Sequence, residues 1–250
     1  MRPLAILFTV LGLLLATSAR AQVPADPDCS NPRHATDSLL VWISTQAHDP
    51  AKALTCVDID PALPELATHI PSVGPVFDDP RATFVNDDGR HHIRLSKEPF
   101  DVIYSDVATY AQYAGLGTVE FFETCRARLA SEGLFVLKLH VDTLTVQGLE
   151  RFVATFLQVF PESALFSNEA TPVLVGFQRP VAEQLAAALP SAKARYGDGV
   201  VERLARRTLA DADALRAMAK GPVLTDDRPM GLAQALIGPT VDASQQGAVE

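Results

Sequence analysis

Short apolar segments that end in or lead to an acidic residue recur through the first half of the 250-residue chain. Each segment has the length and the β-branched or aromatic content of a buried strand. The acids at these strand ends are Asp58, Asp88 and Asp106. In an open parallel α/β sheet, ligands bind beyond the carboxyl ends of the strands. We therefore expect the three acids at one edge of such a sheet.

Apolar strands and amphipathic helices alternate along the chain. The expected parallel strands are 38–43, 54–59, 82–85, 100–104 and 134–139. Two later apolar runs, 164–166 and 173–177, flank a polar turn and indicate an antiparallel hairpin. This pattern predicts an α/β fold with a doubly wound, mostly parallel sheet and an antiparallel edge hairpin.

Helices are expected between these strands. Thr118 is suited to cap the helix before the last parallel strand, and Gly133 is suited to the position just past its end. Apolar residues recur at helical spacing from Leu149 to Phe160, which predicts a further helix. The other expected helices are 64–70, 181–189 and about 198–219.

The first 21 residues have the pattern of an export signal. Arg2 gives a positive start, residues 4–16 are almost wholly apolar, and Ala19-Arg20-Ala21 has the A-x-A form of a cleavage site. Thirteen helical residues span about 20 Å, less than the roughly 30 Å hydrocarbon core of a bilayer. We therefore expect cleavage after Ala21 and an exported protein, periplasmic or secreted. Anchoring to a membrane by the N-terminus is the alternative.

Composition divides the remaining chain into three parts. Residues 22–37 are polar and proline-rich and are expected to be a flexible mature N-terminus. Residues 38–236 have the length of one α/β domain, and 237–250 are expected to be a flexible tail. The net charge of −9 argues against a nucleic-acid partner, because such binding depends on Lys and Arg neutralising phosphates. The same charge is compatible with a small cationic ligand.

The three cysteines do not form a recognisable metal motif. Cys56 and Cys125 fall in an expected strand and helix, so we expect both in the core. Whether Cys29 forms a disulfide stays open. The adjacent His91 and His92 do not share a face, and no Cys and His set has zinc-ligand spacing, so no metal site is expected.

Five motifs follow one another between about residues 54 and 230. They are Val57-Asp58-Ile59-Asp60-Pro61, Asn86-Asp87-Asp88-Gly89-Arg90, Phe100-Asp101-Val102-Ile103-Tyr104-Ser105-Asp106, Glu120-Phe121-Phe122 through Gly133-Leu134-Phe135-Val136-Leu137, and Leu224-Thr225-Asp226-Asp227-Arg228-Pro229. Their order and spacing resemble the spermidine synthases, the polyamine aminopropyltransferases. The resemblance implies a class I, S-adenosylmethionine-dependent methyltransferase-like Rossmann-type fold.

The resemblance also implies a reaction and the residues that carry it. These enzymes move an aminopropyl group from decarboxylated S-adenosylmethionine, a co-substrate and not a covalently bound cofactor, to a polyamine. Asp106 matches the catalytic acid, which takes a proton from an amine whose pKa is near 10. Asp58 matches the acid that holds the ribose hydroxyls. Asp88 and Gly89 match the pair whose Asp contacts the adenine amino group, and an Asx turn is the structural alternative for Asp88.

Two departures from the family pattern lower the expected activity. The family's first strand runs into a glycine-rich loop that passes close to the nucleoside, whereas Ser44–Pro50 contains no glycine. The position of the family's second acid, which holds the diamine, is Thr109. We therefore expect a spermidine synthase-like domain whose aminopropyl transfer is weak or lost, and the sequence leaves open whether it is an enzyme.

A role without catalysis is the alternative. The exported chain would then bind a polyamine or another small cation, or contact an envelope protein partner. A homodimer also stays open.

Overall fold

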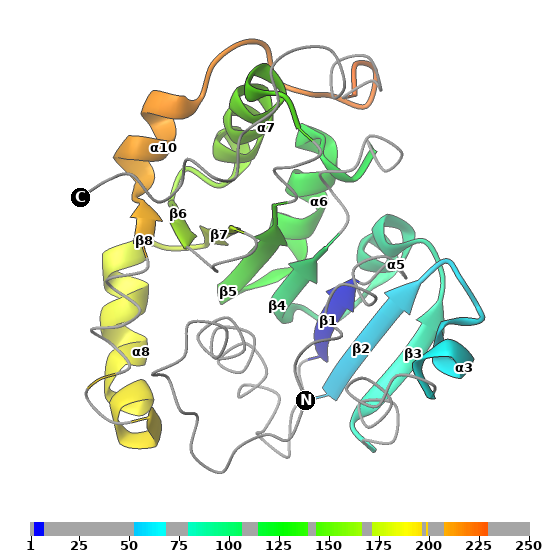
Figure 1. Cartoon of the computed structure of the whole chain (residues 1–250). Coiled ribbons are helices and arrows are strands. Elements are labelled where there is room, and N and C mark those ends of the chain that lie inside the picture. Colours follow the sequence, from blue (N-terminus) through cyan, green and yellow to red (C-terminus); the bar gives the residue numbers. More distant parts are fainter. Residues whose placement is uncertain are drawn as a thin grey trace.

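In the computed structural model, the described residues are 3–7, 53–68, 80–106, 115–139, 144–166, 172–196, 199 and 208–229. Their strands form one eight-stranded sheet in the order β3-β2-β1-β4-β5-β7-β6-β8 (Figure 1). The strands are β1 (Pro3–Leu7), β2 (Ala53–Asp58), β3 (Ala82–Asn86), β4 (Phe100–Ser105), β5 (Leu129–Lys138), β6 (Ser163–Phe166), β7 (Val173–Phe177) and β8 (Thr208–Ala210).

The sheet is mostly parallel. Strands β1 to β5 pair in parallel, while β7 runs antiparallel to β5 and to its hairpin partner β6. The strand order reverses where β1 and β4 lie side by side. The predicted doubly wound sheet with an antiparallel edge hairpin is therefore confirmed.

The centre of the sheet holds the N-terminal strand. Pro3–Leu7 pairs with β2 on one side and with β4 on the other. The strand expected at 38–43 lies outside the described residues. A short apolar run such as Pro3–Leu7 is compatible with a strand as well as with a signal sequence, and length alone does not separate the two. Cleavage after Ala21 stays a prediction.

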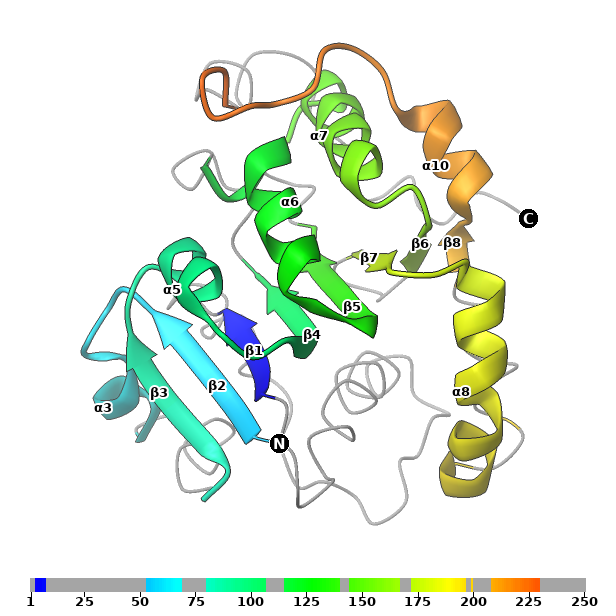
Figure 2. The same cartoon turned by 180° about the vertical axis from the view of Figure 1, so that it is seen from behind.

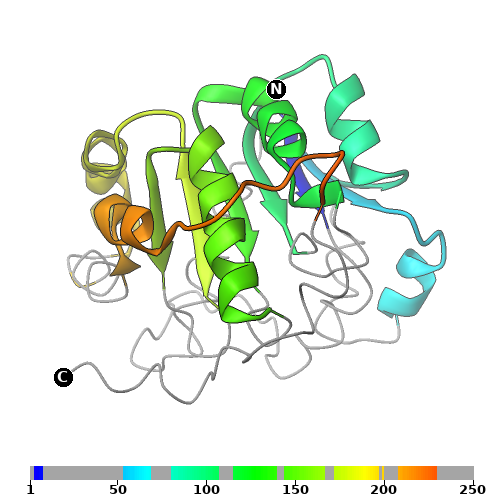
Figure 3. The same ribbon diagram turned by 90° about the horizontal axis from the view of Figure 1, so that it is seen from above.

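Six helices are described in full. They are α3 (Leu63–Thr68), α5 (Gly89–Leu95), α6 (Val119–Arg128), α7 (Val146–Val159), α8 (Val181–Tyr196) and α10 (Ala212–Met218). Thr118 caps α6 as expected, because its side chain accepts the Phe121 N–H. Figure 3 shows α6 and α7 side by side on one face of the sheet. No helix in the described part of the chain is long and apolar enough to cross a membrane.

Two expectations about helices were wrong. Gly133 does not follow the end of α6, because that helix ends at Arg128 and the chain passes directly into β5. A Cβ on Gly133 would lie 3.0 Å from the backbone of Ala130, so a larger residue would require a local shift of the chain, in the stretch where the pairing of β5 with β4 is irregular. The helix expected at about 198–219 is also wrong at 208–210, where β8 pairs with β6 and forms the edge strand of the sheet. Edge pairing overrides local helix propensity at these residues.

Side-chain alternation along the strands builds two cores. In β4 and β5, Ile103 and Phe135 face a cluster that includes α5, α6, α7 and α10. Tyr104 and Val136, one residue further along each strand, face a second cluster, against which Val181 and Leu185 of α8 pack. Alternation with period two places residues 102, 104 and 106 of one strand, and 134, 136 and 138 of the other, on the α8 side. Figure 2 shows the sheet from behind, with α8 at its edge.

The first core is dominated by phenylalanines. Six of them are fully buried and contact one another in edge-on, tilted or stacked pairs: Phe121, Phe122, Phe135, Phe152, Phe156 and Phe160. Cys56 and Cys125 are buried free thiols, as expected from the sequence. Burial raises the pKa of the Cys56 thiol to about 11.

Candidate functional site

The three strand-end acids lie at the carboxyl edge of the parallel sheet. Asp58 is the last residue of β2, Asp88 follows β3, and Asp106 follows β4 directly. Since these strands run in the same direction, all three residues stand at one edge. The strand order reverses between β1 and β4, which is where open α/β sheets bind ligands. The expected common edge is confirmed, while the role of each acid stays a prediction.

Asp58 is a buried carboxylate, and one of its two oxygens has no hydrogen-bond partner among the described residues. Its side chain is nearly inaccessible, and its Oδ1 accepts the Asp60 N–H at 2.8 Å. Its Oδ2 is buried with no hydrogen-bond partner among the described residues. Burial raises the pKa of Asp58, and the Asp60 N–H opposes this shift. The carboxylate can therefore accept hydrogen bonds from a ligand that reaches the edge of the sheet.

Neighbouring side chains fix the position of the Asp58 backbone. Asn86 donates from Nδ2 to the carbonyl oxygens of Asp58 at 3.1 Å and of Ile59 at 3.0 Å. Asp60 accepts the Ala62 N–H at 2.9 Å, so it shapes the turn into α3. The carboxyl ends of β2 and β3 are thus tied together beside Asp58.

Asp88 has a structural task in the described chain. It caps α5, and its Oδ1 accepts the His91 N–H at 2.8 Å. Gly89, the first residue of α5, is buried. The sequence predicted a turn at Asp88 but not this helix. Asp87 contacts the His91 Nδ1 at 2.9 Å, and this hydrogen bond lowers the pKa of Asp87. No group of His, Cys, Asp and Glu among the described residues is placed to hold a metal ion.

Asp106 forms an ion pair that the sequence analysis did not anticipate. Its side chain is buried, and its Oδ2 lies 3.2 Å from the Lys138 Nζ. Lys138 is the last residue of β5 and is itself largely covered. The sequence does contain a signal for this pair, since Lys138 directly follows the apolar run Leu134–Leu137. Buried lysines are rare unless they are paired, so a lysine at the end of a buried strand indicates an acidic partner.

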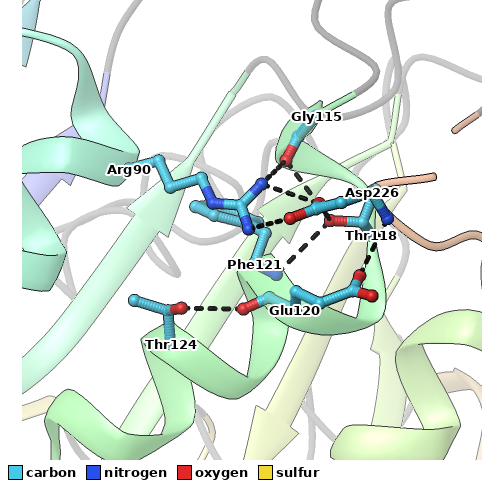
Figure 4. A network of polar contacts seen from close by, with 7 residues as sticks. All are labelled: Arg90, Gly115, Thr118, Glu120, Phe121, Thr124 and Asp226. Atoms are coloured by element: carbon cyan, nitrogen blue, oxygen red, sulfur yellow. Dashed lines mark hydrogen bonds and ion pairs between the residues drawn. The ribbon is translucent and has the colours of Figure 1, made fainter.

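The C-terminal motif holds two helices at the edge of the site (Figure 4). Arg90 in α5 donates to both carboxylate oxygens of Asp226, at 2.8 and 2.5 Å. Thr118 donates its hydroxyl to Asp226 at 2.7 Å, and the Asp226 N–H donates to Glu120 at 3.0 Å. Arg90 also donates to the Gly115 carbonyl at 3.1 Å. The hydrogen bond from Arg90 lowers the pKa of Asp226.

The two departures that lower the expected activity are not part of the described structure. Ser44–Pro50 and Thr109 both lie outside the described residues, as does Cys29.

The family model and the curated relatives that the chain matches all belong to the polyamine aminopropyltransferases. Residues 43–178, more than half of the chain, match the model of the spermine/spermidine synthase domain. The chain is 28% identical over 132 residues to polyamine aminopropyltransferase 1 of Aquifex aeolicus, covering 52% of this chain and 47% of that protein. It is 32% identical over 137 residues to the polyamine aminopropyltransferase of Hydrogenobaculum sp., with the same two coverages. The matched part thus spans about half the length of these curated relatives.

A solved structure supports the same fold. A probable spermidine synthase from Corynebacterium glutamicum superposes with a TM-score of 0.52 at 22% sequence identity, covering 90% of this chain and 72% of that one.

Proposed function

Since the chain belongs to the spermine/spermidine synthase domain family, we propose that the carboxyl edge of its sheet binds an S-adenosyl-type nucleoside and has little or no aminopropyl transfer to free polyamines. The nucleoside would be decarboxylated S-adenosylmethionine or its product 5′-methylthioadenosine. Asp58 would hold the ribose, and Asp106 would stand at the reacting amine.

The observation that carries this proposal is the unused oxygen of Asp58. A buried polar atom without a partner costs free energy, and the cost is larger when the atom carries charge. The Asp58 Oδ2 is such an atom, at the carboxyl edge of the sheet, beyond which ligands bind in sheets of this kind. Two vicinal ribose hydroxyls would supply the missing donors, so ligand binding would relieve a cost that the free protein bears.

Asp106 supports the family's type of reaction but not a high rate. The sulfonium of the donor is already a good leaving group, so the protein has to orient the reactants and to accept a proton from the amine. Asp106 is buried just past the end of β4, at the same edge of the sheet as Asp58, where a base is needed.

The sequence argues against efficient turnover. Side chains along Ser44–Pro50 replace the glycine backbone that admits the nucleoside tail, which weakens its positioning. Thr109 cannot pair with the second ammonium of a diamine, and the loss of one partner of a buried charge pair costs about 2–5 kcal/mol.

An exported protein without catalysis is the second candidate. The pattern of residues 1–21 favours it, because S-adenosyl donors are charged and do not cross a bilayer readily. The chain would then bind a small cation or contact an envelope protein. The acidic net charge of −9 is compatible with a cationic ligand.

Nucleoside binding provides the test. Purified protein is titrated with 5′-methylthioadenosine, and the unfolding midpoint is followed, since a ligand that binds the native state raises it. Asp58→Asn removes one charge and the ribose acceptor, whereas the control Asp60→Asn removes one charge from the neighbouring turn. We expect a shift in the wild type and in Asp60→Asn, and none in Asp58→Asn. No shift in the wild type, or an equal shift in Asp58→Asn, would contradict the proposal.

A further inference from the structure

The register of the sheet brings Lys138 against Asp106. Tyr104 of β4 lies opposite Val136 of β5, and Ser105 lies opposite Leu137. One further step along both strands sets Asp106 opposite Lys138, on the α8 side of the sheet. The contact between the two side chains is therefore built into the pairing of two central parallel strands.

Burial makes this ion pair different from those on the surface. The Lys138 side chain is 17% exposed and that of Asp106 is 5% exposed. By contrast, the ion pair between Lys220 and Glu150 has a lysine that is 65% exposed. Charges in a covered position are screened less by water and salt. The buried Lys138 ammonium therefore has a strong effect on which charged ligands can bind beside Asp106.

The Lys138 ammonium is also the chemical equivalent of one end of a polyamine. Both are primary ammonium groups on a flexible alkyl chain, with three hydrogen-bond donors. In the proposed function, Asp106 is the carboxylate that meets the acceptor amine. The Lys138 Nζ lies 3.2 Å from that carboxylate, within hydrogen-bonding distance.

We propose that Lys138 fills the acceptor-amine position of the site from within the chain and so excludes free polyamines from Asp106. This inference rests on the proposed function for the identity of the site. A polyamine that enters must displace the lysine or place a second ammonium beside it, and like charges at short range repel. Lys138 is thus a specificity-determining residue that selects against cationic acceptors.

The test compares putrescine binding by calorimetry in the full chain and its variants. Lys138→Gln removes the ammonium and keeps a polar side chain. The matched control is Lys220→Gln, which removes an equal charge from the exposed pair with Glu150. We expect putrescine to bind Lys138→Gln at least about tenfold more tightly than the wild type, equivalent to about 1.4 kcal/mol, and Lys220→Gln to bind like the wild type. Equal affinity in all three proteins would overturn the inference.

A second measurement uses the wild type and does not depend on the variant folding. An amine-directed reagent labels lysines, and mass spectrometry gives the labelling of Lys138 relative to Lys220. A bound polyamine would release Lys138 from Asp106 and so increase its labelling. Because the inference is that polyamines are excluded, millimolar putrescine should leave this ratio unchanged. An increase in the ratio would show that polyamines displace the lysine, against the inference.

The two proposals fail in different ways. A gain of putrescine binding in Lys138→Gln without any shift by 5′-methylthioadenosine would reject the nucleoside site and retain the role of Lys138. A nucleoside shift without a gain of putrescine binding would retain the proposed function and reject the role of Lys138.

Discussion

Arg90 and Asp226 are joined by two hydrogen bonds although 136 residues separate them in the sequence. Arg90 follows Gly89 at the start of α5, and Asp226 belongs to the C-terminal motif. The pair therefore fixes the corner that contains Asp88 against the last described segment of the chain.

We expect Asp226→Asn to lower the free energy of unfolding by about 0.5–1 kcal/mol, as for a partly exposed ion pair. The variant loses the charge that Arg90 contacts, although its amide oxygen can still accept from Thr118. Urea denaturation measures the change, with Asp227→Asn as the control in the adjacent exposed position. A cost that is the same in both variants would mean that the pair with Arg90 contributes nothing specific.

Gly176 provides a test of packing between β7 and the phenylalanine core. A Cβ at this position would lie 2.6 Å from the ring of Phe160, which stacks on Phe135. We expect Gly176→Ala to cost about 1–3 kcal/mol, as overpacking does. Gly115→Ala is the control, because a Cβ there would meet no atom within 4 Å. Equal unfolding midpoints of the two variants would be inconsistent with this packing.

Asp58 makes stability depend on pH in a defined direction. Burial raises the pKa of Asp58, so the folded chain holds this proton to higher pH than the unfolded chain does. Its contribution to stability is fully present below the unfolded pKa of about 3.9 and is lost as pH rises through the folded pKa. The free energy of unfolding of Asp58→Asn should therefore increase relative to that of the wild type as pH rises from the unfolded to the folded pKa of Asp58. Chemical denaturation at a series of pH values measures this difference, and a difference that falls with rising pH would contradict the assignment.

The sequence predicted the positions of the acids but not their neighbours. Asp58 and Asp106 each come at the end of a buried apolar run. Such a run predicts where a strand ends, and this prediction does not depend on which strand it pairs with. Lys138 was missed because its contact with Asp106 depends on the register between β4 and β5, which the apolar pattern does not give. The sequence predicts a helix at 208–210, because the pairing of this segment with β6 is a tertiary contact that the local residues do not reveal. The sequence predicts Gly133 just past a helix end, because the direct passage from α6 into β5 leaves no local signal.

Export is a separate prediction. We expect mass spectrometry of protein recovered outside the cytoplasm to show Gln22 as the first residue. Such a chain lacks Pro3–Leu7, which the structure places between β2 and β4, so another strand has to take that position. An intact Met1 on cytoplasmic protein would remove the export argument against catalysis.

Turnover decides between a weak and a working aminopropyltransferase. Purified protein is incubated with decarboxylated S-adenosylmethionine and putrescine beside an Asp106→Asn variant, and spermidine is quantified. Loss of donor orientation can cost about 7–11 kcal/mol of the catalytic effect in favourable systems. We therefore expect little or no spermidine from the wild type and none from the variant. Rapid spermidine formation by the wild type that disappears in Asp106→Asn would contradict the low activity proposed for this site.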